Sequence, residues 1–95
     1  MSDDLQLFVI AYDIVDDRRR ARVSALLEQS ATRVQLSLFE AMVTAQDAAK
    51  LTQKVIHMLA AGDKLRAYPL PSRMTDEIVS FGGPPIENND GYWLL

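Results

Sequence analysis

The stretch that decides the fold is LQLFVIAYDIVDD, at residues 5–17. Its first part, residues 5–12, is a nearly unbroken apolar run with β-branched and aromatic members, which is typical of a central strand covered on both faces. Asp13 follows this strand. Asp16 and Asp17 supply carboxylates where a helix begins, because such a group accepts the free backbone N–H groups of the first turn. The stretch therefore predicts a buried strand that passes directly into a helix.

The helix that follows is expected to run to about residue 30 and to bury one stripe of side chains. The stripe recurs at helical spacing, at Val23, Leu26, Leu27 and Ser30. Four arginines crowd the first turns, where the helix dipole favours anions over cations. Most of their guanidinium groups are therefore expected to face solvent or a partner: Arg18, Arg19, Arg20 and Arg22.

Residues 33–43 alternate polar and apolar in their first half, which predicts strand structure with one wet face. One long strand and two strands around a turn both fit this segment. Thr44 then begins a second helix, with Asp47 three residues later as in a capping box, and this helix is expected to end at Gly62-Asp63.

The last third of the chain predicts short strands. Residues 64–70 have strand character, and Pro69 marks a strand end or an unpaired edge because it cannot donate to a ladder. Residues 77–81 are another strand candidate, whereas residues 86–90 resemble a loop. The apolar and aromatic end, residues 91–95, is expected to add a strand or to pack on a second copy, because water would solvate it poorly.

This order of elements predicts an α+β fold, ferredoxin-like β-α-β-β-α-β with an extra C-terminal strand, in a homodimer. A chain of 95 residues cannot fill two hydrophobic cores, so we expect one ferredoxin-like domain at residues 1–83 and a tail at residues 84–95. Because so small a domain buries only about two-thirds of its unfolded surface, a core shared with a second copy would stabilise it.

Composition places the chain among ordinary globular proteins, with 48% hydrophobic and 24% charged residues. The absence of cysteine excludes disulfides and thiolate metal sites. The longest apolar run is too short to span a bilayer, and the acidic start differs from a signal peptide, so a cytoplasmic protein without a membrane partner is expected. A net charge of −3 means that nucleic-acid binding must depend on a local basic surface.

Asp13, at the end of the first strand, is the candidate metal ligand. One carboxylate is a poor magnesium site, but two copies of Asp13 brought together by twofold symmetry make a better one. From the pattern alone, a role for Asp13 in ending the strand fits equally well. Arg20, Arg22 and Arg33 are candidate phosphate contacts, although ion pairs on a solvated helix face are the commoner arrangement. Tyr12 and Phe39 fit a site lining or, more commonly, the core.

Other catalytic sites find no support in the residues. His57 is the only histidine and lies apart from the other candidates, so no His-based triad or zinc cluster can be assembled. The run Gly82-Gly83-Pro84-Pro85 has the wrong form for a phosphate-binding loop.

Three segments in order together resemble one known family. They are FVIAYDIVDDRRRARVSALLE at residues 8–28, RVQLSLFEAMV at residues 33–43 and KLRAYPL at residues 64–70. The resemblance covers about residues 5–82 and is to the small CRISPR-associated endoribonuclease family, the second core subunit of the spacer-acquisition (adaptation) complex.

The resemblance implies an antiviral-defence homodimer in which the two copies of Asp13 share Mg²⁺ or another divalent cation such as Mn²⁺. It implies a metal-dependent endonuclease of single-stranded RNA or double-stranded DNA, and a dimer that holds duplex DNA for the CRISPR integrase subunit. Family positions implicated in activity match Tyr12, Asp13, Arg20, Arg22, Arg33 and Phe39. The arginines expected to bind nucleic acid are Arg18, Arg19, Arg20, Arg22 and Arg33.

The residues also leave three alternatives open. A non-catalytic nucleic-acid-binding dimer would use the same arginines without cleavage. The related virulence-associated D family of toxin-type ribonucleases shares the fold, although the full motif set fits it less well. A regulatory or ligand-binding module is the third alternative, because this fold hosts many unrelated functions.

Overall fold

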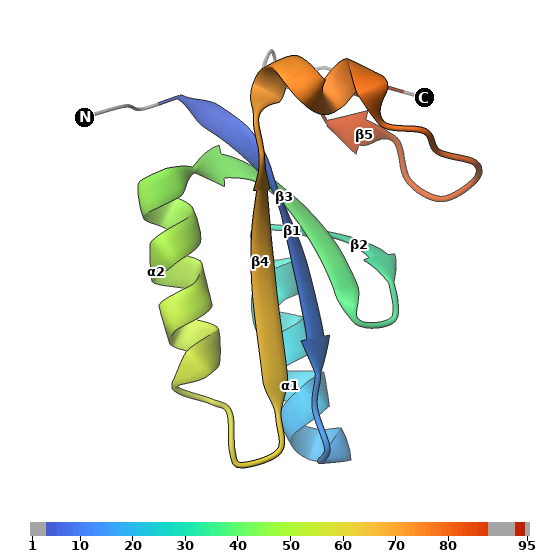
Figure 1. The fold of residues 1–95 in the computed structure, drawn as a ribbon. Helices are drawn as coiled ribbons and strands as arrows, with labels where there is room; N and C mark the ends of the chain where they lie inside the picture. The colour runs from blue at the N-terminus through green and yellow to red at the C-terminus, as the bar shows by residue number, and fades with distance from the viewer. Residues whose placement is uncertain (1–3, 88–92, 95) are drawn as a thin grey trace.

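Four antiparallel strands form one sheet, and two helices pack on one of its faces (Figure 1). The structure, a computed structural model, describes residues 4–87 and 93–94. In chain order the elements of this unit are β1 (Leu5–Asp13), α1 (Asp17–Glu28), β2 (Thr32–Gln35), β3 (Leu38–Thr44), α2 (Ala45–Ile56) and β4 (Lys64–Leu70). The strand order β2-β3-β1-β4 is ferredoxin-like, so the predicted α+β fold is confirmed.

Strand β1 is central and carries the core. It pairs antiparallel with β3 on one side and with β4 on the other. Ile10 and Tyr12 face the helices and are 0% and 6% exposed. They belong to a cluster of buried residues from both helices and the sheet: Ile10, Tyr12, Ile14, Val23, Leu27, Phe39, Ala41, Leu51 and Val55.

The opposite face of β1, here called the open face, is covered only at one end. Because side chains alternate along a strand, Leu7, Val9, Ala11 and Asp13 point away from the helices. Leu7 is 1% exposed, Val9 and Ala11 are half-buried, and Asp13 is exposed. The prediction that this strand is covered on both faces is therefore confirmed only for its first part.

The cover on the open face comes from the chain that follows β4. Since β4 runs antiparallel to β1, Leu70 lies opposite Leu7, and a 3₁₀ helix, η1 (Ser72–Glu77), packs against β1. Figure 1 shows η1 and the short strand β5 (Ile86–Glu87) gathered at this end of the sheet, away from the end where β1 leads into α1. The topology thus leaves the carboxyl end of β1 uncovered.

The segment at residues 33–43 contains two strands around a turn, which resolves the two alternatives. Leu36 and Ser37 form the turn between β2 and β3, and the ladder register shifts between Arg33 and Gln35. Leu36 is 76% exposed, so the alternation of the first half breaks where the chain reverses. A one-residue irregularity of this kind is typical of a bulge beside a turn.

Both predicted helix starts are confirmed, but the end of α2 was predicted wrongly. Asp16 caps α1 through Arg19 N–H at 2.8 Å, and Thr44 Oγ1 caps α2 through Asp47 N–H at 3.1 Å. Helix α2 ends at Ile56, well before Gly62. Apolar residues recur at helical spacing beyond the end of the helix because the turn that follows it also packs against the core.

Two predictions for the last part of the chain were wrong. The strand expected at residues 77–81 does not form: Glu77 ends η1, and residues 78–81 pair with no neighbouring strand in the described structure. Val79 and Phe81 are fully exposed. Residues Ile86–Glu87 form β5 and pair with β6 (Trp93–Leu94) in a separate two-stranded sheet. The terminal stretch therefore contributes a strand outside the main sheet, and residues 88–92 and 95 lie outside the described chain.

The predicted division at residue 83 and the packing of the tail on a second copy stay predictions. In the described part of the chain, no helix has the length and apolar composition that crossing a bilayer requires.

Replacing Ile10 tests the core on the helix side. Ile10→Ala is expected to lower the free energy of unfolding by about 2–5 kcal/mol, because the truncation leaves a cavity in a packed core. Urea denaturation measures the change. Val79→Ala, at a 96% exposed position, is the matched control and should stay within about 0.5 kcal/mol of the original protein. Equal losses in both variants would contradict the assigned core.

Candidate functional site

Asp13 lies at the exposed carboxyl end of β1, on the open face of the sheet. Tyr12 precedes it and points to the opposite face, into the core. In the described part of the chain, no side chain or backbone N–H group bonds to the Asp13 carboxylate. Its oxygens are therefore available to a ligand, and a role for Asp13 as a helix cap is excluded because Asp16 fills it.

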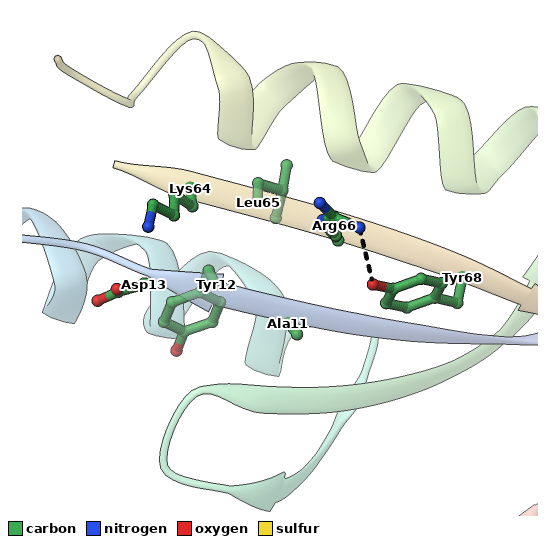
Figure 2. A pocket seen from close by; sticks show the side chains of 7 residues that line it. All are labelled: Ala11, Tyr12, Asp13, Lys64, Leu65, Arg66 and Tyr68. Atoms are coloured by element: carbon green, nitrogen blue, oxygen red, sulfur yellow. Dashed lines mark hydrogen bonds between the residues drawn. The ribbon is translucent and has the colours of Figure 1, made fainter. Parts of the chain in front are cut away.

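A shallow hollow of about 230 Å³ adjoins Asp13 on this face (Figure 2). In the β1–β4 ladder, Asp13 is paired with Lys64, Ala11 with Arg66, and Val9 with Tyr68. The Arg66 guanidinium donates a hydrogen bond to the Tyr68 hydroxyl at 3.3 Å. The hollow, here called the Asp13 hollow, is lined by Ala11, Tyr12, Asp13, Lys64, Leu65, Arg66 and Tyr68.

Three of these residues, Lys64, Arg66 and Tyr68, were not among the predicted site residues. The signal was present in the alternation of KLRAYPL, which places them on one face of a strand. Their position beside Asp13 depends on the pairing of β4 with β1, which the alternation alone does not specify. Further along the open face, partial burial raises the pKa of Glu40, which is paired with Val9.

The donor chemistry at Asp13 fits a hard divalent cation, but one chain supplies a single carboxylate. Magnesium takes oxygen ligands, keeps several waters and is commonly held by one or two carboxylates together with substrate phosphates. Among the described residues, no three His, Cys, Asp or Glu side chains come together to form a metal cluster. A magnesium site here therefore needs a second copy of Asp13 or a bound phosphate.

A second hollow, here called the arginine cleft, lies between α1 and the β2–β3 turn. Its volume is about 190 Å³, and it is lined by Tyr12, Asp17, Arg20, Ala21, Ser24, Arg33 and Leu36. The Arg33 guanidinium bonds to Ser24 Oγ, to Glu28 Oε2 at 3.0 Å and to the Leu36 carbonyl at 3.2 Å. The structure thus brings two of the three candidate phosphate contacts, Arg20 and Arg33, to one cleft, and their binding of phosphate stays a prediction.

Arg20 connects this cleft with the end of β1. Its guanidinium donates to the Ile14 carbonyl at 3.2 Å and pairs with Asp17 one turn back along α1. Ile14 directly follows Asp13, so Arg20 reaches the backbone beside the candidate metal ligand, although Asp13 itself points to the open face. Arg20 is therefore the predicted arginine whose contacts join the two regions.

Tyr12 and Phe39 are core residues. Their rings stack with centroids 6.2 Å apart, and Phe39 is 0% exposed. The Tyr12 hydroxyl donates to the Leu36 carbonyl at 3.4 Å, and the Arg33 guanidinium lies 5.3 Å from the Phe39 ring centroid. The two rings are therefore placed to hold Arg33 and the β2–β3 turn in position from the core side.

The remaining predicted arginines of α1 differ in their surroundings. Arg18 and Arg22 are exposed and bond to no group in the described part of the chain, so both are available to phosphates. Arg19 is half-buried and its guanidinium is held by Asp63, with Nε 2.6 Å from Oδ2 and a second nitrogen 3.3 Å from Oδ1. Phosphate binding by Arg19 stays a prediction, and it would compete with this ion pair.

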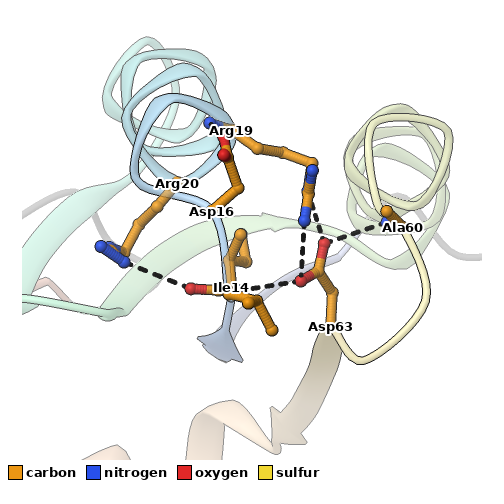
Figure 3. A network of polar contacts seen from close by, with 7 residues as sticks. Ile14, Asp16, Arg19, Arg20, Ala60 and Asp63 are labelled. Atoms are coloured by element: carbon orange, nitrogen blue, oxygen red, sulfur yellow. Dashed lines mark hydrogen bonds and ion pairs between the residues drawn. The ribbon is translucent and has the colours of Figure 1, made fainter.

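Asp63 is the centre of a network that sequence reasoning missed, here called the Asp63 clamp (Figure 3). Besides Arg19, its carboxylate accepts hydrogen bonds from Val15 N–H and Ala60 N–H, both at 2.9 Å. The side chain is 0% exposed. Gly62, with φ of 91°, forms the turn that delivers it. The clamp ties the β1–α1 turn to the start of β4, the two segments that carry Asp13 and Lys64.

Comparison with known proteins gives one consistent family. The family model described as CRISPR associated protein Cas2 matches residues 6–78. The CRISPR-associated endoribonuclease Cas2 3 of Synechocystis sp. is 37% identical over 86 residues, which cover 90% of this chain and 94% of that protein. The CRISPR-associated endonuclease Cas2 2 of Thermus thermophilus is 36% identical over 81 residues, covering 84% and 88% of the two chains.

A solved structure agrees with these relatives. A chain in the structure described as a partial Cas6-RT-Cas1–Cas2 complex superposes with a TM-score of 0.70 at 28% identity. The match covers 85% of this chain and 90% of that chain. The resemblance drawn from the three sequence segments is thereby confirmed.

The Asp63 clamp predicts a specific loss of stability in acid. Bonds first from Arg19, then from Val15 and Ala60 N–H, hold the pKa of Asp63 well below its usual range. In an unfolded chain the pKa of Asp is about 3.9. The ionised Asp63 carboxylate therefore stabilises the fold fully above about pH 4, and this stabilisation fades as the pH falls further. Asp63→Asn should therefore unfold at a lower temperature than the original protein at pH 7, with a gap that narrows below about pH 4.

Thermal unfolding followed by circular dichroism at pH 3 to 7 measures this gap. Asp76→Asn, at an exposed position in η1, is the control and should leave both the melting temperature and its pH dependence unchanged. A constant gap between Asp63→Asn and the original protein across the whole pH range would contradict the clamp.

Proposed function

Because this chain belongs to the Cas2 family of CRISPR-associated proteins, we propose that it acts as a homodimer in spacer acquisition, cleaving phosphodiester bonds in a metal-dependent reaction. Single-stranded RNA and double-stranded DNA are the candidate substrates. The names of the Synechocystis and Thermus relatives, an endoribonuclease and an endonuclease, support nuclease activity. The observation that carries the proposal is the exposed, unbonded carboxylate of Asp13 at the uncovered end of the central strand.

The homodimer is proposed from the open face of the sheet. Val9 and Ala11 lie half-buried there, with Tyr68 50% exposed beside them, and no helix of the described residues covers this end. A second copy on this face would bury these side chains and bring its own Asp13 toward the first. It would thereby supply the second carboxylate that one chain lacks. The tail at residues 84–95 is proposed to add to this contact.

Each candidate residue then has a role set by its surroundings. Asp13 from each copy would hold Mg²⁺ or Mn²⁺. Such a cation supplies Lewis acidity, which activates water and neutralises charge on a phosphodiester oxygen. Arg18 and Arg22 would bind phosphates from the solvent face of α1, and Arg20 and Arg33 would do so at the arginine cleft. Tyr12 and Phe39 are buried, so they would contribute by supporting the cleft.

A second candidate function is a non-catalytic dimer that holds duplex DNA for the integrase subunit. One observation favours it: among the described residues, the Asp13 hollow contains a single carboxylate and no histidine, so neither a second metal ligand nor an imidazole base accompanies Asp13 in one chain. The structure described as a partial Cas6-RT-Cas1–Cas2 complex supports Cas1 as the partner. The arginines serve both functions, and a toxin-type ribonuclease has no comparable support.

Cleavage by the purified protein tests the first function. With Mg²⁺ and labelled RNA or duplex DNA, cleavage is expected to fall at least a hundredfold in Asp13→Ala, because loss of the carboxylate removes a direct metal ligand. For comparison, loss of a group that only hydrogen-bonds to a metal ligand lowers activity by about 10- to 100-fold. Asp76→Ala, at an exposed position on η1, should cleave normally.

Sedimentation of Asp13→Ala at micromolar concentration should show the same dimer as the original protein, so that a lost site is distinguished from a lost assembly. Undiminished cleavage by Asp13→Ala would refute the assignment of this carboxylate. A protein that sediments only as a monomer would refute the shared site.

Salt dependence of binding tests the arginine surface. For duplex DNA, each lost phosphate contact lowers the slope of log affinity against log salt by about 0.9. Arg18→Ala with Arg22→Ala is therefore expected to lower the slope by about 2 per chain that contacts the duplex. The double variant Lys50→Ala with Lys54→Ala, two exposed positions on α2, is matched in charge and should keep the original slope. An equal change in both variants would mean that binding is not localised to α1.

A further inference from the structure

We propose that Lys64 binds the phosphate group of the nucleic acid that enters the Asp13 hollow, as a specificity residue opposite the candidate metal ligand. This inference rests on the proposed function and deepens it, because it names a phosphodiester as the group that the hollow recognises. Lys64 begins the third family-like segment, at residues 64–70, but it is not among the candidate site residues.

The pairing of β1 with β4 places the two charges together. Asp13 and Lys64 are direct partners in this antiparallel ladder, so their side chains leave the sheet on the same face, with Cβ atoms about 4.5–5.5 Å apart. Within residues 4–87 and 93–94, no helix covers that face at this end. Figure 2 shows both side chains extending from the same end of the two strands, and both line the Asp13 hollow.

The Lys64 ammonium is uncommitted in the described structure. No carboxylate lies within 4.0 Å of it, so it has not closed an ion pair with Asp13 although the register would allow one. The nearest cation along the same face of β4, Arg66, is hydrogen-bonded to Tyr68. Lys64 is thus the cation of this hollow with all three donors available to a ligand.

Charge explains why a phosphate group needs this lysine. An exposed carboxylate repels a phosphodiester, and the chain as a whole is acidic, with a net charge of −3. Lys64 and Arg66 together outweigh the single charge of Asp13 in the hollow. The ammonium therefore makes the hollow attractive to an anion in the absence of a metal, and a divalent cation at Asp13 would add to that attraction.

The Asp63 clamp fixes where Lys64 begins. Asp63 precedes Lys64 in the chain, and its side chain is held by the β1–α1 turn through Val15 and Arg19. The first residue of β4 is therefore anchored to the segment that follows Asp13. The clamp therefore helps to fix the spacing of the backbone from which the two charged side chains extend.

The alternative is an ordinary exposed cross-strand pair without a ligand. Such a pair would make Lys64 indifferent to nucleic acid, and its removal would change little. The two arrangements differ in a second way, because an ammonium that faces Asp13 opposes a metal ion at the same carboxylate. Removing its charge should therefore weaken phosphate binding and tighten metal binding at once, which a merely structural lysine would not do.

The experiment compares Lys64→Gln, Lys64→Arg and the control Lys50→Gln in the full-length dimer. Binding of a duplex DNA and of a single-stranded RNA is measured with EDTA present, by fluorescence anisotropy at 0.1 M salt. At 0.1 M salt, one phosphate contact contributes a factor of about ten in affinity for duplex DNA, from a slope of about 0.9, and about five for a single strand, from a slope of about 0.7. Lys64→Gln is expected to lose these factors for each contact. Lys64→Arg keeps the charge and should bind as the original protein does, and so should Lys50→Gln.

Manganese binding to the protein without nucleic acid, followed by isothermal titration calorimetry, is the second measurement. Lys64→Gln should bind Mn²⁺ several-fold more tightly than the original protein, whereas Lys64→Arg and Lys50→Gln should not. Unchanged nucleic-acid affinity in Lys64→Gln overturns the inference. Equal or weaker Mn²⁺ binding in Lys64→Gln also overturns it, provided that Asp13→Ala binds Mn²⁺ more weakly than the original protein does.

The two measurements also separate this inference from the proposed function. If the original protein and Asp13→Ala bind Mn²⁺ equally poorly, the metal site of the proposed function fails, and the affinity comparison in EDTA alone decides the role of Lys64. If Asp13→Ala abolishes Mn²⁺ binding but Lys64→Gln changes neither readout, the metal site stands and Lys64 is only a surface residue.

Discussion

The structure depends on a central strand that is apolar on both faces while helices cover only one of them. On the helix side, Ile10 and Tyr12 enter a continuous core with both helices. On the open face, the chain that follows β4 folds back over Leu7 but does not extend to Asp13. One end of a hydrophobic strand is thereby left exposed, with the charged Asp13 at its tip. This is the surface on which the proposed second copy and the proposed metal ion would bind.

The same end of the sheet is held together by a single buried carboxylate. Asp63 ties the turn after β1 to the turn before β4, and its bond to Arg19 removes one arginine from the basic surface of α1. The residues that stabilise this end of the sheet are therefore neighbours of the residues proposed to function there. The clamp contributes no charge to a ligand, but it fixes the backbone from which Asp13 and Lys64 extend.

The charged side chains of this protein act through their local surroundings rather than through the net charge of the chain. Although the chain is acidic overall, its arginines divide into sets with different surroundings. Arg18 and Arg22 face solvent, whereas Arg20 and Arg33 are held at the arginine cleft by hydrogen bonds to carbonyl groups and neighbouring acids. A fixed guanidinium presents a defined geometry to a phosphate, and a solvated one supplies attraction that salt screens.

The sequence by itself determined the parts that short-range physics controls: the strand that ends at Asp13, the caps at Asp16 and Thr44, and the exposed arginines of α1. It failed for residues 78–81, since a strand needs a neighbour that alternation cannot supply. Only the tertiary structure set Lys64 opposite Asp13 and joined Asp63 to Arg19, 44 residues away, because ladder register and long-range ion pairs exist only once distant segments pack together.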